Sequence, residues 1–383
     1  MRQFTLKPIA SRPPVVMAGL TIVAIMAFAG VTRFVNRFRE QEKALARHLY
    51  ERAMADQQAG KPDLAVEHFR DALVYSPNNF DYQLQLARAL RDTGRTQEAE
   101  AYLVNLWEHS PQDGAVNLAL GRLAARQKSM DKALQYYHNA IYGVWSSNAD
   151  ENRLQVWFEL IQFLIQQNAH PQADAELITL AAELPPRADL RLRVADLFAG
   201  TQDYDHALAE YRQVLKLDRG NVDALAGAGE SAFKLGRYRV AEHYLQLAAN
   251  AKPQDTQVAR LLEVSHQVLA RDPFSGSISI EERNQRLRSI FEDAGKRVDS
   301  CMASENGGEP KAAPQSSPLA DLKAQWTDMK PKLIRLSSNR EAGLPTEVMN
   351  LVLKIEEQTQ NCPAPTATDQ ALLILAQNHG SEP

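Results

Sequence analysis

The sequence predicts an all-α fold: a superhelical solenoid of about six helix pairs, preceded by one transmembrane helix and followed by a small C-terminal helical unit. Three observations predict this class. Alanines recur every 34 residues in the middle of the chain, an uncharged apolar run lies near the N-terminus, and apolar residues at helical spacing follow residue 272. A fixed period of this length is typical of stacked helical hairpins.

The repeat is defined by residues that recur at fixed positions. Six alanines mark the second helix of each unit: Ala65, Ala99, Ala133, Ala173, Ala207 and Ala241. A large apolar or aromatic residue stands four positions after each of them: Phe69, Leu103, Tyr137, Leu177, Tyr211 and Leu245. Because one helix pair cannot bury its apolar face alone, we expect the pairs to stack and share a continuous core.

This pattern resembles the tetratricopeptide repeat, in which a helical hairpin carries alanine, a large apolar residue and a closing proline in its second helix. The resemblance covers about residues 46–255, and its register slips once, by six residues, at a polar insertion around 148–153. Arg52 and Asp56 depart from the pattern in the first unit, and Arg219 replaces the proline of the fifth. Residues 256–270 are expected to cap the array with a polar outer face.

The resemblance implies a concave groove lined by the first helix of every unit. The groove positions of the second and third units are basic: Arg88, Arg91, Arg122 and Arg126. Those of the fifth and sixth units are acidic: Asp189, Asp196, Asp223 and Glu230. Phe158 and Phe233 are expected on an apolar floor between them. We expect the groove to bind a protein segment, with an acidic stretch or a C-terminal carboxylate held by the arginines; the alternative is a set of solvated charges.

The N-terminal apolar run predicts a membrane anchor. Residues 1–14 form a basic tail, and residues 15–34 carry the run that is long enough to span a bilayer core of about 30 Å. The alternative is a cleaved signal peptide, since Ala27, Phe28 and Ala29 fit the small-x-small cleavage rule. We favour a retained single-pass helix because the run continues directly into a helical pattern.

Two opposing signals bear on which side of the membrane the repeats occupy. Arg33, Arg37 and Arg39 follow the span, and the positive-inside rule would keep the repeats in the cytoplasm. A disulfide would instead require an oxidising compartment. We expect an extracytoplasmic, periplasmic repeat domain.

Residues 279–383 predict a C-terminal unit of several helices with a flexible loop at 304–318. Cys301 and Cys362 lie near the C-terminal ends of two apolar helical stripes. If these helices run side by side in parallel, a disulfide is geometrically possible. The alternative is two buried free thiols.

The chain carries no motif of a known catalytic or metal centre, so we expect neither an enzyme nor a cofactor or metal site. Its net charge of −4 gives no basic face for nucleic acid, and no small-molecule substrate is indicated. The sequence therefore predicts a membrane-anchored scaffold or adaptor for protein partners in envelope complex assembly. The alternative is a permanent structural subunit of a larger membrane complex.

Overall fold

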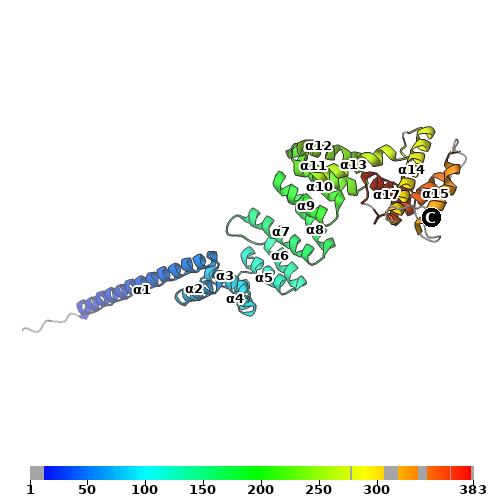
Figure 1. The fold of residues 1–383 in the computed structure, drawn as a ribbon. Coiled ribbons are helices and arrows are strands. Elements are labelled where there is room, and N and C mark those ends of the chain that lie inside the picture. Colours follow the sequence, from blue (N-terminus) through cyan, green and yellow to red (C-terminus); the bar gives the residue numbers. More distant parts are fainter. Residues whose placement is uncertain (1–12, 277, 306–317, 335–342, 363, 381–383) are drawn as a thin grey trace, which may run out of the picture. The chain divides into compact units, whose positions relative to one another are not determined.

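The computed structural model describes residues 13–276, 278–305, 318–334, 343–362 and 364–380, and all regular elements in these ranges are helices, labelled α1 to α17 (Figure 1). The chain divides into two compact units, Met1–Asn168 and Ala169–Pro383. An all-α fold with a run of helical hairpins is therefore confirmed. Most of the basic tail predicted at 1–14 lies outside the described residues.

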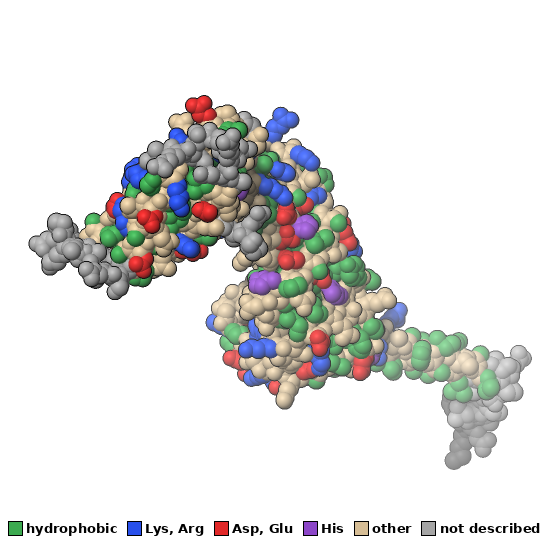
Figure 2. All heavy atoms as spheres, turned by 90° about the vertical axis from the view of Figure 1, so that its right-hand side faces the viewer, with side chains coloured by type: hydrophobic (Ala, Val, Ile, Leu, Met, Phe, Trp, Pro, Cys, Tyr) green, Lys and Arg blue, Asp and Glu red, His purple; other side chains and the backbone are tan. Residues whose placement is uncertain are grey.

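Helix α1 spans Pro13–Gln58, so the apolar run and the first helix of the first pair are one continuous element of 46 residues. At ~1.5 Å per residue it is about 69 Å long. Its part from Met17 onward passes the length and hydropathy test for a membrane span, and the most apolar window is not buried against the rest of the protein. Figure 2 shows this rod covered mostly by hydrophobic side chains. No turn separates the candidate span from the repeats.

The first unit continues as antiparallel helix pairs. Its remaining helices are α2 (Pro62–Tyr75), α3 (Phe80–Asp92), α4 (Thr96–His109), α5 (Gly114–Arg126), α6 (Met130–Ile141) and α7 (Ala149–Gln166). Asn79 and Asp113 cap α3 and α5, since their side chains accept hydrogen bonds from the backbone N–H of Tyr82 and Val116. Such caps satisfy N–H groups that have no partner within the helix, and they fix where the first helix of a pair begins.

The turn inside each pair needs one residue in the left-handed region. Positive φ angles recur at this position: Gly60, Gly94, Lys128, Asn168, Gln202 and Gly236. Glycine adopts this conformation at little cost, whereas L side chains are strained there. The spacing of these residues reproduces the sequence period, including the shift caused by the insertion.

The recurring small residues lie where the helices cross. All six alanines of the repeat pattern are fully buried, and the large residues four positions later are at most 4% exposed. In α5, a Cβ added at Gly121 would lie only 3.3 Å from the ring of Tyr137 in α6. Small residues therefore recur at these positions because the two helices of a pair approach closely there.

The predicted insertion adds an N-terminal turn to α7 and reshapes the connection before it. Residues 142–148 form that connection, and Val144 makes an isolated parallel bridge with Asp113. The N–H of Val144 donates to the carbonyl of Gln112 at 2.7 Å, and the N–H of Gly114 donates to the carbonyl of Val144 at 2.9 Å. The connection is thus fixed to the start of α5.

The second unit contains α8 (His170–Glu183), α9 (Ala188–Gly200), α10 (Tyr204–Leu217), α11 (Val222–Lys234), α12 (Tyr238–Ala251) and α13 (Thr256–Arg271). It ends with α14 (Ile280–Glu305), α15 (Pro318–Ile334), α16 (Leu344–Gln358) and α17 (Ala367–Gly380). Both ends of the predicted loop 304–318 belong to helices, because α14 extends to Glu305 and α15 begins at Pro318. The rest of the predicted loop, residues 306–317, lies outside the described residues.

Helix α13 exposes the polar residues Gln257, Arg260 and Glu263 and also packs on the C-terminal helices. Val264 and Val268 on α13 are buried in the same cluster as residues of the C-terminal helices. Helix α17 packs against α13 as well as against α16. The sequence indicates one apolar face on α13; the second apolar face is identified by its contact with α17.

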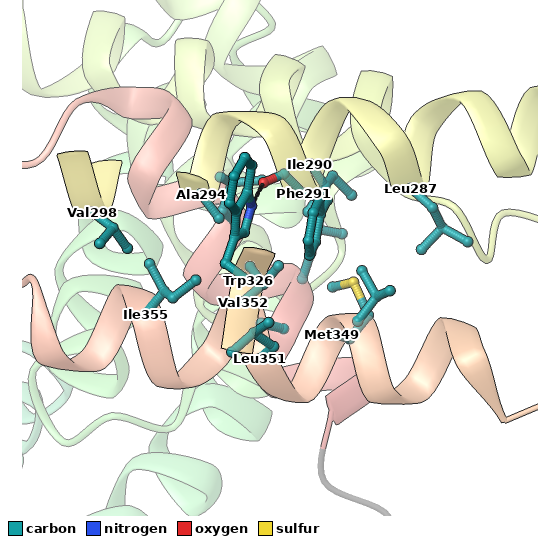
Figure 3. Packing of buried hydrophobic residues seen from close by; sticks show 14 of the residues in the cluster. Leu287, Ile290, Phe291, Ala294, Val298, Trp326, Met349, Leu351, Val352 and Ile355 are labelled. Carbon is teal, nitrogen blue, oxygen red and sulfur yellow. Dashed lines mark hydrogen bonds between the residues drawn. The ribbon is translucent and has the colours of Figure 1, made fainter. Parts of the chain in front are cut away.

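The core of the C-terminal helices forms around an aromatic pair (Figure 3). Phe291 of α14 and Trp326 of α15 stack with ring centroids 5.1 Å apart, and the Trp326 indole N–H donates to the carbonyl of Phe291 at 2.7 Å. Figure 3 also shows Leu287 near Met349 and Val298 near Ile355, so α14 and α16 run in the same direction, which is the arrangement that a disulfide between their ends requires.

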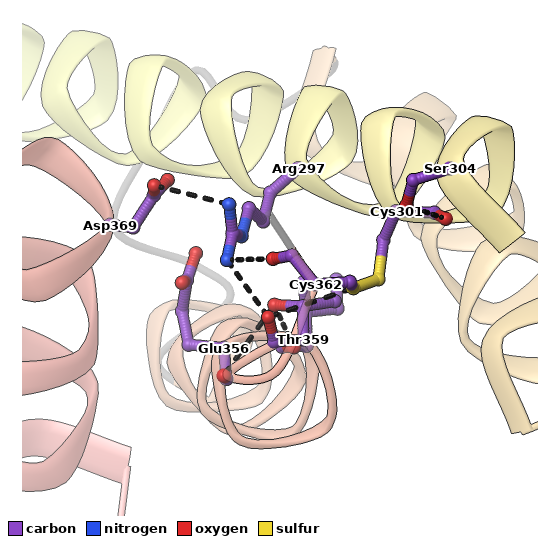
Figure 4. Close-up of a disulfide and its surroundings, with 8 residues drawn as sticks. Arg297, Cys301, Ser304, Glu356, Thr359, Cys362 and Asp369 are labelled. Carbon is purple, nitrogen blue, oxygen red and sulfur yellow. Dashed lines mark hydrogen bonds and ion pairs between the residues drawn. A yellow bond between two sulfur atoms is a disulfide. The ribbon is translucent and has the colours of Figure 1, made fainter. Parts of the chain in front are cut away.

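The two cysteines meet beside the ends of these parallel helices (Figure 4). The structure joins Cys301 and Cys362 in a disulfide, with their Cα atoms 5.4 Å apart. Arg297 lies one helical turn before Cys301 and donates to the carbonyls of Thr359 and Cys362 at 2.8 and 2.5 Å. The Arg297 guanidinium also lies 3.5 Å from Oδ2 of Asp369 on α17. The connection from α16 to α17 is therefore held by α14.

Candidate protein-binding groove

The first unit contains a concave pocket of about 510 Å³ that brings three of the predicted arginines together. It is lined by residues from α1, α3, α5, α7 and the 142–148 connection: Met54, Gln57, Gln58, Gln85, Arg88, Arg91, Leu118, Arg122, Trp145, Asn152 and Gln155. All of these helices are the first members of their pairs. The pocket therefore lies on the face where the resemblance assigned a groove.

Arg122 is already neutralised within the protein. Its guanidinium binds Glu159 of α7 in a bidentate manner, with Nε–Oε1 and Nη2–Oε2 distances of 2.8 and 2.7 Å. The hydroxyl of Tyr137 donates to Oε1 of the same carboxylate at 2.9 Å. The hydrogen bond with Glu159 raises the pKa of Arg122, so this cation is firmly charged but carries its own counter-ion.

Arg91 and Arg126 share the carboxylate of Asp92. Nη2 of Arg91 lies 2.9 Å from Oδ1 of Asp92, and Nη2 of Arg126 lies 3.4 Å from the same oxygen. Arg126 also donates from Nη1 to the carbonyl of Arg91 at 2.7 Å. Nη1 of Arg91 is buried and has no hydrogen-bond partner in the described structure. One donor of Arg91 is therefore still unused.

Arg88 has no carboxylate partner within the described part of the chain, and its buried Nε makes no hydrogen bond. Burial lowers the pKa of Arg88, and the neighbouring positive charges of Arg122 and Arg91 lower it further. Arg88 is half-buried, and leaving its buried Nε unpaired is unfavourable, since buried charged donors in proteins are normally paired. Arg88 is thus the position in this pocket where an added anion would gain the most.

The acidic positions of the second unit form a separate group around Tyr211. The Tyr211 hydroxyl donates to Oδ1 of Asp196 at 2.8 Å. Burial raises the pKa of Asp196, and the charge of Asp223 adds to this increase. Glu230 accepts a hydrogen bond from Gln257 at 3.3 Å. Three of the four predicted acidic residues therefore lie close together.

The fourth acidic residue, Asp189, is exposed, whereas the two predicted aromatic residues take part in packing. Asp189 lies in the first turn of α9 and pairs with Arg187, the residue that precedes this helix, at 2.5 Å. Phe158 is only 2% exposed and belongs to the core. Phe233 is partly buried and packs against the cluster formed by the C-terminal helices. Phe158 is therefore a core residue and not part of an open apolar floor, while the groove role of the partly exposed Phe233 stays a prediction.

Sequence reasoning missed the residues that decide the charge of the pocket. Glu159 and Asp92 neutralise predicted groove arginines, and Trp145 forms part of the wall. One feature of the sequence could have pointed to these residues: the 34-residue period breaks near residue 148, where the groove is expected to be irregular. Among the described residues, no cluster of three His, Cys, Asp or Glu side chains could hold a metal ion.

Comparison with known sequences agrees with the helical-hairpin architecture. The sequence profile of the family described as tetratricopeptide repeat matches residues 56–123, 90–142 and 199–264. A putative cellulose synthase operon protein C from Escherichia coli O157:H7 is 25% identical over 306 residues, covering 76% of this chain and 26% of the relative. The chain thus spans about a quarter of the length of this relative. Tetratricopeptide repeat protein 9C from Xenopus tropicalis is 37% identical over 79 residues, 21% of this chain and 40% of that protein.

Solved structures of similar proteins superpose on this chain with low TM-scores. YrrB, described as a TPR protein with an unusual peptide-binding site, is 18% identical, covers 51% of this chain and 96% of its own, and has a TM-score of 0.37. The C-terminal part of a TPR repeat-containing protein from Cytophaga hutchinsonii is 10% identical, covers 63% and 94% of the two chains, and has a TM-score of 0.43.

Proposed function

We propose that this chain, which carries tetratricopeptide repeats at residues 56–142 and 199–264, is a membrane-anchored scaffold whose first-unit pocket binds an acidic segment of a partner protein. Arg88 carries this proposal, because it lines a concave pocket, its buried Nε has no hydrogen-bond partner, and no carboxylate pairs with it among the described residues. A carboxylate from a partner would replace the missing counter-ion through charge-assisted hydrogen bonds. Arg91 and Arg122 line the same pocket but are already paired with Asp92 and Glu159.

We further propose that α1 anchors this scaffold by a span at 15–34 and that the repeats at 46–255 lie outside the cytoplasm. A continuous helix from the apolar run into the first pair supports the anchor. The Cys301–Cys362 pair supports an oxidising compartment. In this arrangement residues 256–270 close the array and residues 279–383 form the C-terminal unit.

The client is proposed to belong to a membrane-bound envelope assembly. Two relatives named cellulose synthase operon protein C support a polysaccharide synthase assembly as the first class of client to examine. The acidic residues around Tyr211 offer the second unit a different surface, which would repel the same segment. An acidic client is therefore expected to engage the first unit only.

A pull-down in mild detergent with the full-length chain tests this function. We compare wild type with Arg88→Glu, and with Arg239→Glu as the control, because Arg239 is exposed on the second unit. The partners recovered at low salt are identified by mass spectrometry. A partner that is present with wild type and Arg239→Glu but lost with Arg88→Glu supports the scaffold function. Identical partners in all three would reject the pocket and favour a permanent subunit held by other surfaces.

A further inference from the structure

The wall of the first-unit pocket includes a segment that the other helix pairs lack. The connection at 142–148 has seven residues, whereas the other connections between pairs, such as 110–113 and 184–187, have four. Its two backbone hydrogen bonds to the start of α5 hold it in place. The pocket is therefore bounded by a fixed loop as well as by helices.

Trp145 is the side chain that this loop contributes. Its indole N–H donates to the carbonyl of Ala140 at 3.0 Å. Its ring lies against Gly114, where an added Cβ would come within 2.4 Å of the indole carbon Cε2. The ring is thus held between its own loop and the first residue of α5. It remains partly exposed and lines the pocket with Leu118 and Met54.

The charge balance of the pocket selects the kind of anion. Glu159 pairs with Arg122, and Asp92 is shared by Arg91 and Arg126, which leaves Arg88 without a carboxylate partner among the described residues. A single carboxylate would supply a counter-ion for Arg88. A polyphosphate would bring several charges close to the two resident carboxylates and would be repelled by them.

We infer that the pocket recognises an acidic side chain that is next to an apolar or aromatic residue in a partner segment. Arg88 holds the carboxylate, and Trp145 packs on the neighbouring side chain, so Trp145 is a specificity-determining residue. The amides of Gln85 and Gln155 line the same pocket and can bond the backbone of an extended segment. This inference rests on the proposed function and adds the sequence preference of the client.

The test uses fluorescence anisotropy with the full chain in detergent and short labelled peptides containing a central Asp-Phe, Asn-Phe or Asp-Ser pair. Wild type is expected to bind the Asp-Phe peptide at least about tenfold more tightly than either of the others. Arg88→Gln should remove the preference for Asp over Asn. Trp145→Ala should remove the preference for Phe over Ser, and Trp145→Phe should keep most of it.

The outcomes separate this inference from the proposed function. If Arg88→Gln weakens binding but Trp145→Ala keeps the full preference for Phe, the inference is wrong and the acidic-segment scaffold stands. If neither Arg88→Gln nor Arg88→Glu alters peptide binding or the pull-down, both fall. Displacement of the peptide by ATP, lost in Arg88→Gln, would show a phosphate site and also overturn the inference. Circular dichroism of each variant verifies that the helices are retained.

Discussion

Glu356 offers a stability test that depends on the sign of a pKa shift. Its side chain is 4% exposed, and its buried Oε1 has no hydrogen-bond partner in the described structure. Burial first, and then the charge of Asp369, raise the pKa of Glu356 from its usual 4.5 to about 8, although Arg297 opposes this shift. The folded C-terminal helices therefore bind a proton that the unfolded chain releases at neutral pH.

The size and sign of the effect follow from this difference. Below pH 4.5 the carboxyl is protonated in both states, so it contributes no pH dependence. Between there and about pH 8 the free energy of unfolding falls by ~1.4 kcal/mol per pH unit, because only the folded state keeps the proton. At pH 7 the accumulated loss is about 3 kcal/mol. Glu356→Gln keeps the shape of the protonated side chain and should recover most of this loss.

Hydrogen exchange followed by mass spectrometry can measure the change in the full chain, since it reports the opening of α14 and α16 separately from the repeats. Protection in Glu356→Gln should exceed that of wild type by about 3 kcal/mol near pH 7 and by under ~1 kcal/mol near pH 5. The exposed neighbour provides the control Glu357→Gln, which should change nothing. A gain of equal size at both pH values would refute the ionisation argument.

Three other perturbations test the architecture. Replacing Cys301 and Cys362 by Ser opens a loop with a sequence separation of 61 residues and should lower the free energy of unfolding of the C-terminal helices by about 4 kcal/mol. Hydrogen exchange of α14 measured at increasing urea concentration would reveal this loss. Unchanged protection would contradict a stabilising role for the disulfide. Gly94→Ala places a side chain at a φ of +79° and should cost about 1 kcal/mol of stability in thermal unfolding, whereas Gly200→Ala, with open space around it, should be neutral. Deleting residues 15–34 should move the chain from the carbonate-resistant membrane fraction to the supernatant on an immunoblot, and retention in the pellet would show another anchor.

The repeat could be predicted closely because its signal is local. Ala99 and Leu103 recur at spacings that a helix crossing imposes, and any sequence that stacks hairpins must place small residues there. The αL turn at Lys128 and Asn168 follows the same period even without glycine. The C-terminal stripes were visible for the same reason, since burial on one helix face leaves a 3.6-residue pattern.

The candidate site was only partly predictable. The positions of Arg88, Arg91 and Arg122 on one face follow from the repeat register, and the structure brings them into one pocket. Their charge state does not follow from it. Arg122 meets Glu159, 37 residues away, because α5 and α7 are neighbouring first helices and their side chains reach each other. The curvature and rotation of these helices are properties of the assembled unit.

The period, the apolar N-terminal helix and the faces that must be buried could be inferred from the sequence, because each depends on spacing along one helix. Which charges are paired and which apolar faces are covered depends on the packing of the helices. In the structure Phe158 is buried in the core, α13 has a second partner in α17, and Arg88 has no carboxylate partner among the described residues. These outcomes depend on distances between side chains of different helices, and such distances are set only when the helices pack.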